Sequence, residues 1–215
     1  MSTVALSDPI NFIILSFWSL FVIVDPVGAI PTFLAMTARD KTAERVRMAR
    51  LASMVTFLVL VLFSFGGKWI LGAFGVSMPA FEIAGGVILL KVALDMLQAR
   101  QTALKETPEE QAEGKNKDDI AITPLAIPML AGPGAITAVV LLSAQTTNTE
   151  QHIIVAINIF LVSLITFIIL RFAAVRSSIL SAITLKIIVR LMGLLLAAIA
   201  VQFILNGVAS VHQLW

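Results

Sequence analysis

The chain has 215 residues, of which 59% are hydrophobic and 13% are charged, and its mean hydropathy is +0.98. Soluble domains are typically about half apolar and a quarter charged, so this composition excludes a water-soluble globular protein. The chain has no cysteine and only two histidines, which argues against disulfides and metal clusters. We therefore expect an all-α integral membrane protein of one domain, residues 1–215, with no cofactor, metal or nucleic-acid partner.

Six apolar segments approach the roughly 20 residues that a helix needs to cross the hydrocarbon layer. They cover residues 10–36, 51–74, 81–97, 120–144, 153–172 and 187–208. No basic residue precedes the first segment, so we expect a permanent span there rather than a cleaved signal peptide. The long polar stretch at residues 98–119 predicts a linker between two halves of three helices each, residues 9–97 and 120–210.

Basic residues alternate between the two sides of this predicted membrane domain. Apart from Lys68 and Lys91, they lie in the first, third and fifth connections: Arg39, Lys41, Arg45, Arg47, Arg50, Arg100, Lys105, Lys115, Lys117, Arg171, Arg176, Lys186 and Arg190. Connections rich in lysine and arginine stay in the cytoplasm. The pattern therefore predicts a cytoplasmic linker and places both termini on the opposite, periplasmic side.

The two halves share a short motif in their first segments. One segment carries Asp25-Pro26-Val27-Gly28-Ala29-Ile30-Pro31-Thr32, and the other carries Gly132-Pro133-Gly134-Ala135-Ile136-Thr137. Each half has an odd number of spans, so a repeated half must enter the membrane from the opposite side. We therefore expect six transmembrane helices in two inverted-topology three-helix repeats, an architecture found in many secondary transporters.

Proline and glycine cluster in the middle of the first and fourth segments. Proline removes a backbone donor, and glycine tolerates unwinding. Clusters at matched positions predict that the first and fourth helices are discontinuous and that their freed ends bind a substrate. The alternative is that these residues produce kinks and close packing only. The predicted substrate-binding residues are Asp25, Pro26, Gly28, Thr32, Gly132, Pro133, Gly134 and Thr137.

Two features of this predicted site have specific expectations. Asp25 lies about 15 residues into the first segment, near the bilayer centre by helical rise, where a carboxylate must be paired, hydrated or protonated. It is expected to cap the helix after Pro26, or to contact a substrate ammonium or a transported proton, and these roles are compatible. Gly28 and Gly134 are expected to leave freed amides uncovered for a substrate carboxylate.

One pair of charges is predicted to be structural. Lys91 and Asp95 are four residues apart in the third segment, so they share one face of a helix and can form an ion pair. Snorkelling of Lys91 to the membrane surface is the other account of its position.

The chain resembles the MarC family of bacterial and archaeal inner-membrane proteins. The resemblance rests on Asp25-Pro26-Val27-Gly28 with Pro31, Ile83-Ala84-Gly85-Gly86, Pro124-Leu125-Ala126-Ile127-Pro128, Ala131-Gly132-Pro133-Gly134-Ala135-Ile136 and Arg190-Leu191-Met192-Gly193-Leu194. It implies a multi-pass protein of the cell inner membrane and, as a substrate class, small neutral amino acids such as alanine and glycine. Glu82 departs from the arginine expected in many members.

These observations favour a secondary transporter, not an enzyme, that moves a small polar solute by alternating access coupled to protons or another ion. Its partners are the lipid bilayer and a small-molecule substrate, and a homo-oligomer is left open. The alternatives are an integral-membrane enzyme acting on a lipid-soluble substrate, and a channel or assembly protein without transport activity. The enzyme would need clustered acid, base or metal ligands, which the predicted spans lack.

Overall fold

A computed structural model describes residues 9–98, 121–146, 148–176 and 181–212, and these ranges are helical with no strand. The elements in chain order are α1 (Pro9–Val24), α2 (Ala29–Met36), α3 (Thr42–Ala73), α4 (Met78–Leu97), the π-helix η2 (Ala121–Leu130), α7 (Pro133–Gln145), α8 (Thr149–Val175) and α9 (Ala182–His212). By length and composition, α3, α8 and α9 can cross a membrane, and α1 and α2 together make a fourth candidate. Apart from Gln98, the predicted linker lies outside the described residues.

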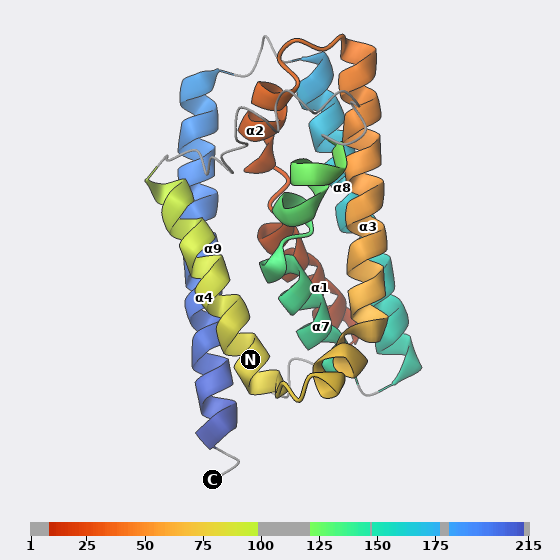
Figure 1. Cartoon of the computed structure of the whole chain (residues 1–215), viewed down its shortest axis with the longest axis vertical. Helices are drawn as coiled ribbons and strands as arrows, with labels where there is room; N and C mark the ends of the chain where they lie inside the picture. Colours follow the sequence, from red (N-terminus) through yellow and green to blue (C-terminus); the bar gives the residue numbers. More distant parts are fainter. Residues whose placement is uncertain (1–8, 99–120, 147, 177–180, 213–215) are drawn as a thin grey trace.

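The helices form an elongated bundle with the two interrupted segments in the middle (Figure 1). On one side α3 packs against α8, and on the other α4 packs against α9. Between them, α1 contacts α7 and α2 contacts η2. In the view of Figure 1, α1 and α2 run upward whereas η2 and α7 run downward. The two interrupted segments therefore lie side by side in opposite directions.

The first interruption follows from the residues after Val24. Asp25 adopts a left-handed backbone conformation with φ +47°, which ends a right-handed helix. Pro26 then has no amide hydrogen to continue the ladder. The chain restarts at once, because the amide of Ala29 donates to the carbonyl of Asp25 at 3.1 Å. The result is two helices bent by 40°, as predicted for this segment.

The second interruption separates η2 from α7. The amide of Ala131 donates to the carbonyl of Ala126 at 2.8 Å, which closes the last π-type turn. Gly132 then adopts an extended conformation with φ −74° and ψ 171°, and Pro133 occupies the start of α7. Proline is favoured there because its missing amide hydrogen would have no partner within the helix. This predicted discontinuity is also present in the structure.

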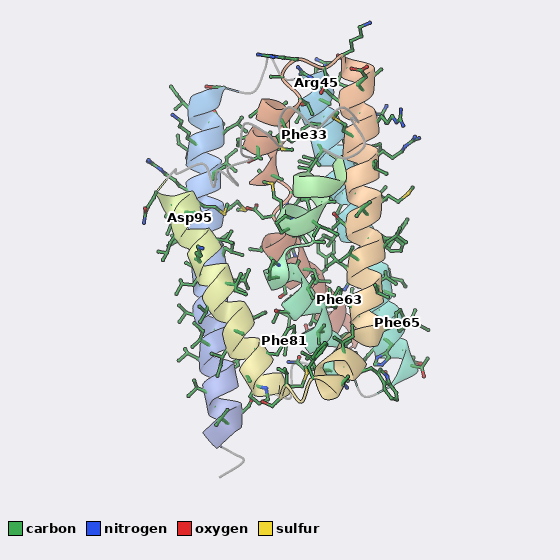
Figure 2. The ribbon with its side chains drawn as sticks, viewed as in Figure 1. Phe33, Arg45, Phe63, Phe65, Phe81 and Asp95 are labelled. Carbon is green, nitrogen blue, oxygen red and sulfur yellow. The ribbon has the colours of Figure 1, made fainter. Side chains whose placement is uncertain are left out.

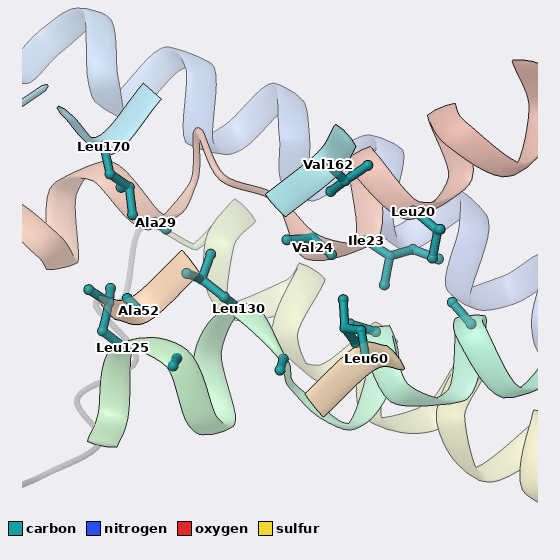
Figure 3. Close-up of a cluster of buried hydrophobic side chains, with 14 of the residues drawn as sticks. Leu20, Ile23, Val24, Ala29, Ala52, Leu60, Leu125, Leu130, Val162 and Leu170 are labelled. Atoms are coloured by element: carbon teal, nitrogen blue, oxygen red, sulfur yellow. The ribbon is translucent and has the colours of Figure 1, made fainter. Parts of the chain in front are cut away.

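The buried core lies where both interrupted segments meet α3 and α8. Figure 3 shows Leu20, Val24, Leu60, Leu130 and Val162 converging from α1, α3, η2 and α8, and each is at most 2% exposed. Large apolar side chains elsewhere point outward from the bundle. Leu62 on α3, Ile168 on α8 and Leu194 on α9 are 64%, 55% and 60% exposed. Such outer faces are suited to lipid rather than to water.

One end of the bundle collects the basic residues. The end of α2, the start of α3, the end of α8 and the start of α9 meet at the top of Figure 1, so they bring the first and fifth connections together. Arg45 lies there (Figure 2). Its Nε donates to the carbonyls of Thr37 at 3.0 Å and Asp40 at 3.1 Å, and its Nη2 donates to that of Ala38 at 3.0 Å. Arg45 therefore satisfies carbonyls at the end of α2.

Candidate solute site at two helix breaks

Asp25 caps the helix that follows it. The amide of Gly28 donates to Asp25 Oδ1 at 3.0 Å, which satisfies one of the unpaired donors at the start of α2. The left-handed conformation of Asp25 is one that aspartate adopts more readily than most residues. The expected capping role is therefore present in the geometry. One carboxylate oxygen is engaged by this hydrogen bond, and Asp25 remains half-buried.

Gly28 is packed from two sides. A Cβ placed on Gly28 would overlap the carboxylate of Asp25 and lie 2.9 Å from Met96 Cε. Only glycine therefore allows the backbone to pass between the capping side chain and Met96, which belongs to α4. The other predicted residues of this break, Pro26 and Thr32, are buried and half-buried respectively.

The second break is equally tight. A Cβ on Gly132 would overlap the carbonyl oxygen of Pro128, and one on Gly134 would overlap the side chain of Leu89. Thr137 is 2% exposed, and its Oγ1 donates to the carbonyl of Pro133 at 2.8 Å. Thr137 therefore hydrogen-bonds within its own helix here.

The amide of Gly28 is not left uncovered in this conformation, contrary to expectation. The amide of Gly28 is occupied by Asp25, and Leu89 lies against Gly134. A groove of about 430 Å³ lies elsewhere, on the outer face between α3 and α8, lined by Phe57, Phe65, Ile153, Ile157 and Phe160 among others. Its mostly apolar lining suits lipid better than a polar solute. The chain's own side chains fill the space at Gly28 and Gly134, and backbone carbonyls fill it at Gly132.

Residues of α4 connect the two breaks, and sequence reasoning did not assign them to the site. Met96 contacts the position of Gly28, Leu89 contacts Gly134, and Gly85 allows the close approach of Thr137. Residues 85, 89 and 96 lie on one helix face, because spacings of four and eleven residues return to nearly the same direction. That periodicity was visible in the sequence. It did not show which neighbour the face contacts.

Further polar groups are buried around the site. Among the described residues, the one buried side-chain nitrogen or oxygen atom without a hydrogen-bond partner is Ser163 Oγ on α8. Glu82 on α4 is only 8% exposed and has the side chain of Asn206 on α9 as a hydrogen-bond partner. Glu82 is therefore buried between α4 and α9, close to the start of α4.

Lys91 and Asp95, the predicted ion pair, both lie on α4. Lys91 is exposed and Asp95 is half-buried, and Asp95 lies toward the upper end of α4 (Figure 2). Within the described part of the chain, the structure records no ion pair between them. The pair stays a prediction.

Comparison with known proteins places this geometry in a family. A family model described as MarC family integral membrane protein matches residues 10–212. The chain belongs to the MarC family. It is 36% identical over 206 residues to a UPF0056 membrane protein of Methanocaldococcus jannaschii, covering 96% of this chain and 90% of that relative. It is 37% identical over 198 residues to the UPF0056 membrane protein YvbG of Bacillus subtilis, covering 92% and 94%. No solved structure matches.

Membership in the MarC family confirms the resemblance seen in the motifs, and with it an integral membrane protein in contact with a lipid bilayer. The match includes both breaks and the α4 face that contacts them. The candidate site therefore lies wholly within the family's shared region.

Proposed function

We propose that this protein is a secondary transporter of small polar solutes, with small neutral amino acids as the favoured class, and that its site lies between the two helix breaks. The observation that carries the proposal is the antiparallel pairing of two interrupted segments in the middle of the bundle. Irregular backbone at membrane depth is tolerated where protein or a water-filled cavity satisfies it. Paired broken helices are a common way to build a transport site.

The contact pattern supports two inverted three-helix repeats. In such a repeat, α1 and α2 correspond to η2 and α7, α3 corresponds to α8, and α4 corresponds to α9. The contact of α1 with α8 then corresponds to that of η2 with α3, and the contact of α1 with α7 corresponds to that of η2 with α2. All of these contacts are present. Two further pairs, α3 with α8 and α4 with α9, each join equivalent helices of the two halves, whereas the contact of α4 with α7 has no comparable counterpart between α9 and α2. On this proposal the bundle crosses the membrane six times.

The chemistry of the breaks suits a zwitterion. A half-helix presents unpaired amides and the positive end of its dipole, which favour a carboxylate. Asp25 Oδ1 accepts the Gly28 amide, and the second carboxylate oxygen is proposed to receive the substrate ammonium. The surrounding Ala29, Gly132, Gly134 and Ala135 are small, so a short substrate side chain fits best. A proton on Asp25 is the proposed coupling ion.

The charge distribution supports an orientation. The end of the bundle that holds Arg45 and the other basic residues of the first and fifth connections is proposed to face the cytoplasm. Both termini are then periplasmic, and the membrane is the cell inner membrane. A reporter active only in the cytoplasm tests this placement. We expect activity when it is inserted at residues 109–117 and silence when it follows Trp215, and the reverse result overturns the orientation.

Counterflow into proteoliposomes tests the function. Vesicles loaded with unlabelled alanine should accumulate radiolabelled alanine or glycine saturably and faster than protein-free vesicles. Arginine and glutamate added outside should not compete. Equal flux with and without correctly inserted protein, for every neutral amino acid tried, contradicts the proposal. Ion-dependent current without saturation would identify a channel instead.

A further inference from the structure

One face of α4 touches both breaks. Gly85, Leu89 and Met96 contact Thr137, Gly134 and Gly28 respectively. These contacts involve apolar side chains, glycine backbone and the side chain of Thr137, whose hydroxyl donates within α7. They fill the positions where the proposed function places a solute.

Helices α4 and α9 pack intimately on each other. A Cβ on Gly86 would lie 2.8 Å from the carbonyl oxygen of Ala200. One on Gly207 would lie 2.9 Å from the carbonyl oxygen of Pro79. One on Gly193 would lie 2.9 Å from Met96 Cβ. Backbone-to-backbone packing of this kind couples the two helices, so they are expected to move as a pair.

The other helices are tied together differently. Asn158 on α8 donates to the carbonyl of Ile13 at 3.1 Å and to Ser16 Oγ at 2.7 Å, both on α1. Ser64 Oγ on α3 lies 2.7 Å from Ser143 Oγ on α7. These hydrogen bonds join the outer pair α3 and α8 to the interrupted segments. Together α1, α2, α3, η2, α7 and α8 form what we call the frame.

We propose that Leu89 and Met96 are the residues that close the transport site in this structure, and that α4 and α9 move together away from the frame to open it. This inference rests on the proposed function. It adds which helices move during transport, and which side chains select solutes by size (the size filter). Among the described residues, no side-chain hydrogen bond joins this face of α4 to the two breaks, and an entering solute takes the place of the two side chains. Their bulk therefore limits the size of the solute that the site can hold.

A reversible cross-link tests the movement. The chain has no native cysteine, so an introduced pair gives no background disulfide. Leu89 Cγ lies 2.6 Å from a Cβ built on Gly134, which brings Leu89→Cys and Gly134→Cys within disulfide reach. Oxidation of this double variant should lower alanine counterflow at least tenfold, and a reductant should restore it.

The matched control lies within the frame. Ser64→Cys with Ser143→Cys replaces two hydroxyls that are 2.7 Å apart and ties α3 to α7, which do not separate on this proposal. Its oxidation should change counterflow less than twofold. Equal inhibition of both pairs, or full counterflow with the α4–α7 cross-link formed, overturns the proposed movement. Each single-cysteine variant is measured for melting and counterflow, so that a folding defect is recognised.

Substrate size tests the filter. Met96→Ala should raise the rate of leucine counterflow relative to alanine at least threefold. Met54→Ala, at an exposed position on α3, should leave that ratio unchanged. An unchanged ratio in both Met96→Ala and Leu89→Ala overturns the size filter.

Failure of the proposed function is recognised separately, because wild-type protein then shows no counterflow. The opening still has its own readout in that case. A charged, water-soluble thiol reagent should modify Leu89→Cys, since opening exposes this position to water. Absence of modification from both sides of the membrane overturns the opening movement.

Discussion

The frame and the α4–α9 pair are held together by different interactions. In the frame, hydrogen bonds between helices fix α1 to α8 and α3 to α7. In the pair, glycines bring the two helix backbones together, as at Gly86 against Ala200 and Ile204. Where the two regions meet, Leu89 and Met96 press on glycines. The molecule therefore consists of two tightly built bodies with an apolar contact between them.

The difference follows from the bilayer as a solvent. Lipid tails are as apolar as leucine, so burial of apolar surface drives helix association weakly, and close packing and hydrogen bonds decide which helices stay together. Two helices separate most easily where they are joined by apolar side chains alone, without hydrogen bonds and without close backbone packing along their length. In this structure such a contact lies over the two breaks.

Substitution of Gly86 by leucine should have the largest effect. The new side chain meets the backbone of Ala200 and Ile204, which cannot move aside without separating α4 from α9. We expect a loss of about 3 kcal/mol or more, at the upper end of the cost of overpacking, measured as the melting temperature in detergent. Gly66→Leu is the control, because its nearest neighbour is Ile70 Cδ1 at 3.8 Å. If both variants melt alike, glycine contacts do not hold the pair.

Asp25→Asn separates capping from transport. Asparagine tolerates the left-handed conformation and its amide oxygen can accept the Gly28 hydrogen bond, so melting should stay within about 0.5 kcal/mol of wild type. Alanine counterflow should fall at least tenfold because the negative charge is lost. Asp25→Ala removes the cap as well and should cost about 1–2 kcal/mol. Normal counterflow by Asp25→Asn across pH would make Asp25 a cap alone, with no part in ammonium recognition or proton coupling.

Asn158→Ala tests the frame. Asn158 is 1% exposed and donates both recorded hydrogen bonds to α1. We expect a loss of about 1–2 kcal/mol, since interhelical hydrogen bonds in membranes are worth about 0.6 and at most about 1.7 kcal/mol. A double-mutant cycle with Ser16→Ala isolates the bond between the two side chains. Additive losses would show that this bond does not hold α1 to α8.

Neutralising Lys91 and Asp95 should have the smallest effect. Lys91 is exposed, and exposed pairs four residues apart contribute about 0.3–0.5 kcal/mol. Melting of Lys91→Gln, Asp95→Asn and the double variant gives the coupling between them. Additive changes remove the predicted ion pair. Reduced counterflow with unchanged melting would assign these residues to function instead.

Much of the local structure was determined by the sequence alone. Composition excluded a soluble fold, and the α1–α2 and η2–α7 interruptions occur at the predicted residues because Pro26, Gly132 and Pro133 act on their own backbone. The hydrogen bond from the Gly28 amide to Asp25 likewise joins residues only three apart in the sequence. Such features depend on neighbours along the chain, so a pattern of residue types is sufficient to predict them.

The tertiary structure decided what faces the breaks. Leu89 and Met96 are ordinary apolar residues in the sequence, and only the packing of α4 against the two breaks places them over Gly134 and Gly28. Glu82, far from α9 along the chain, is buried beside Asn206 for the same reason. An apolar helix in a bilayer can turn any of its faces toward protein or lipid at similar cost. The choice of face is therefore made by close packing between helices, which depends on the shapes of side chains far apart in the sequence.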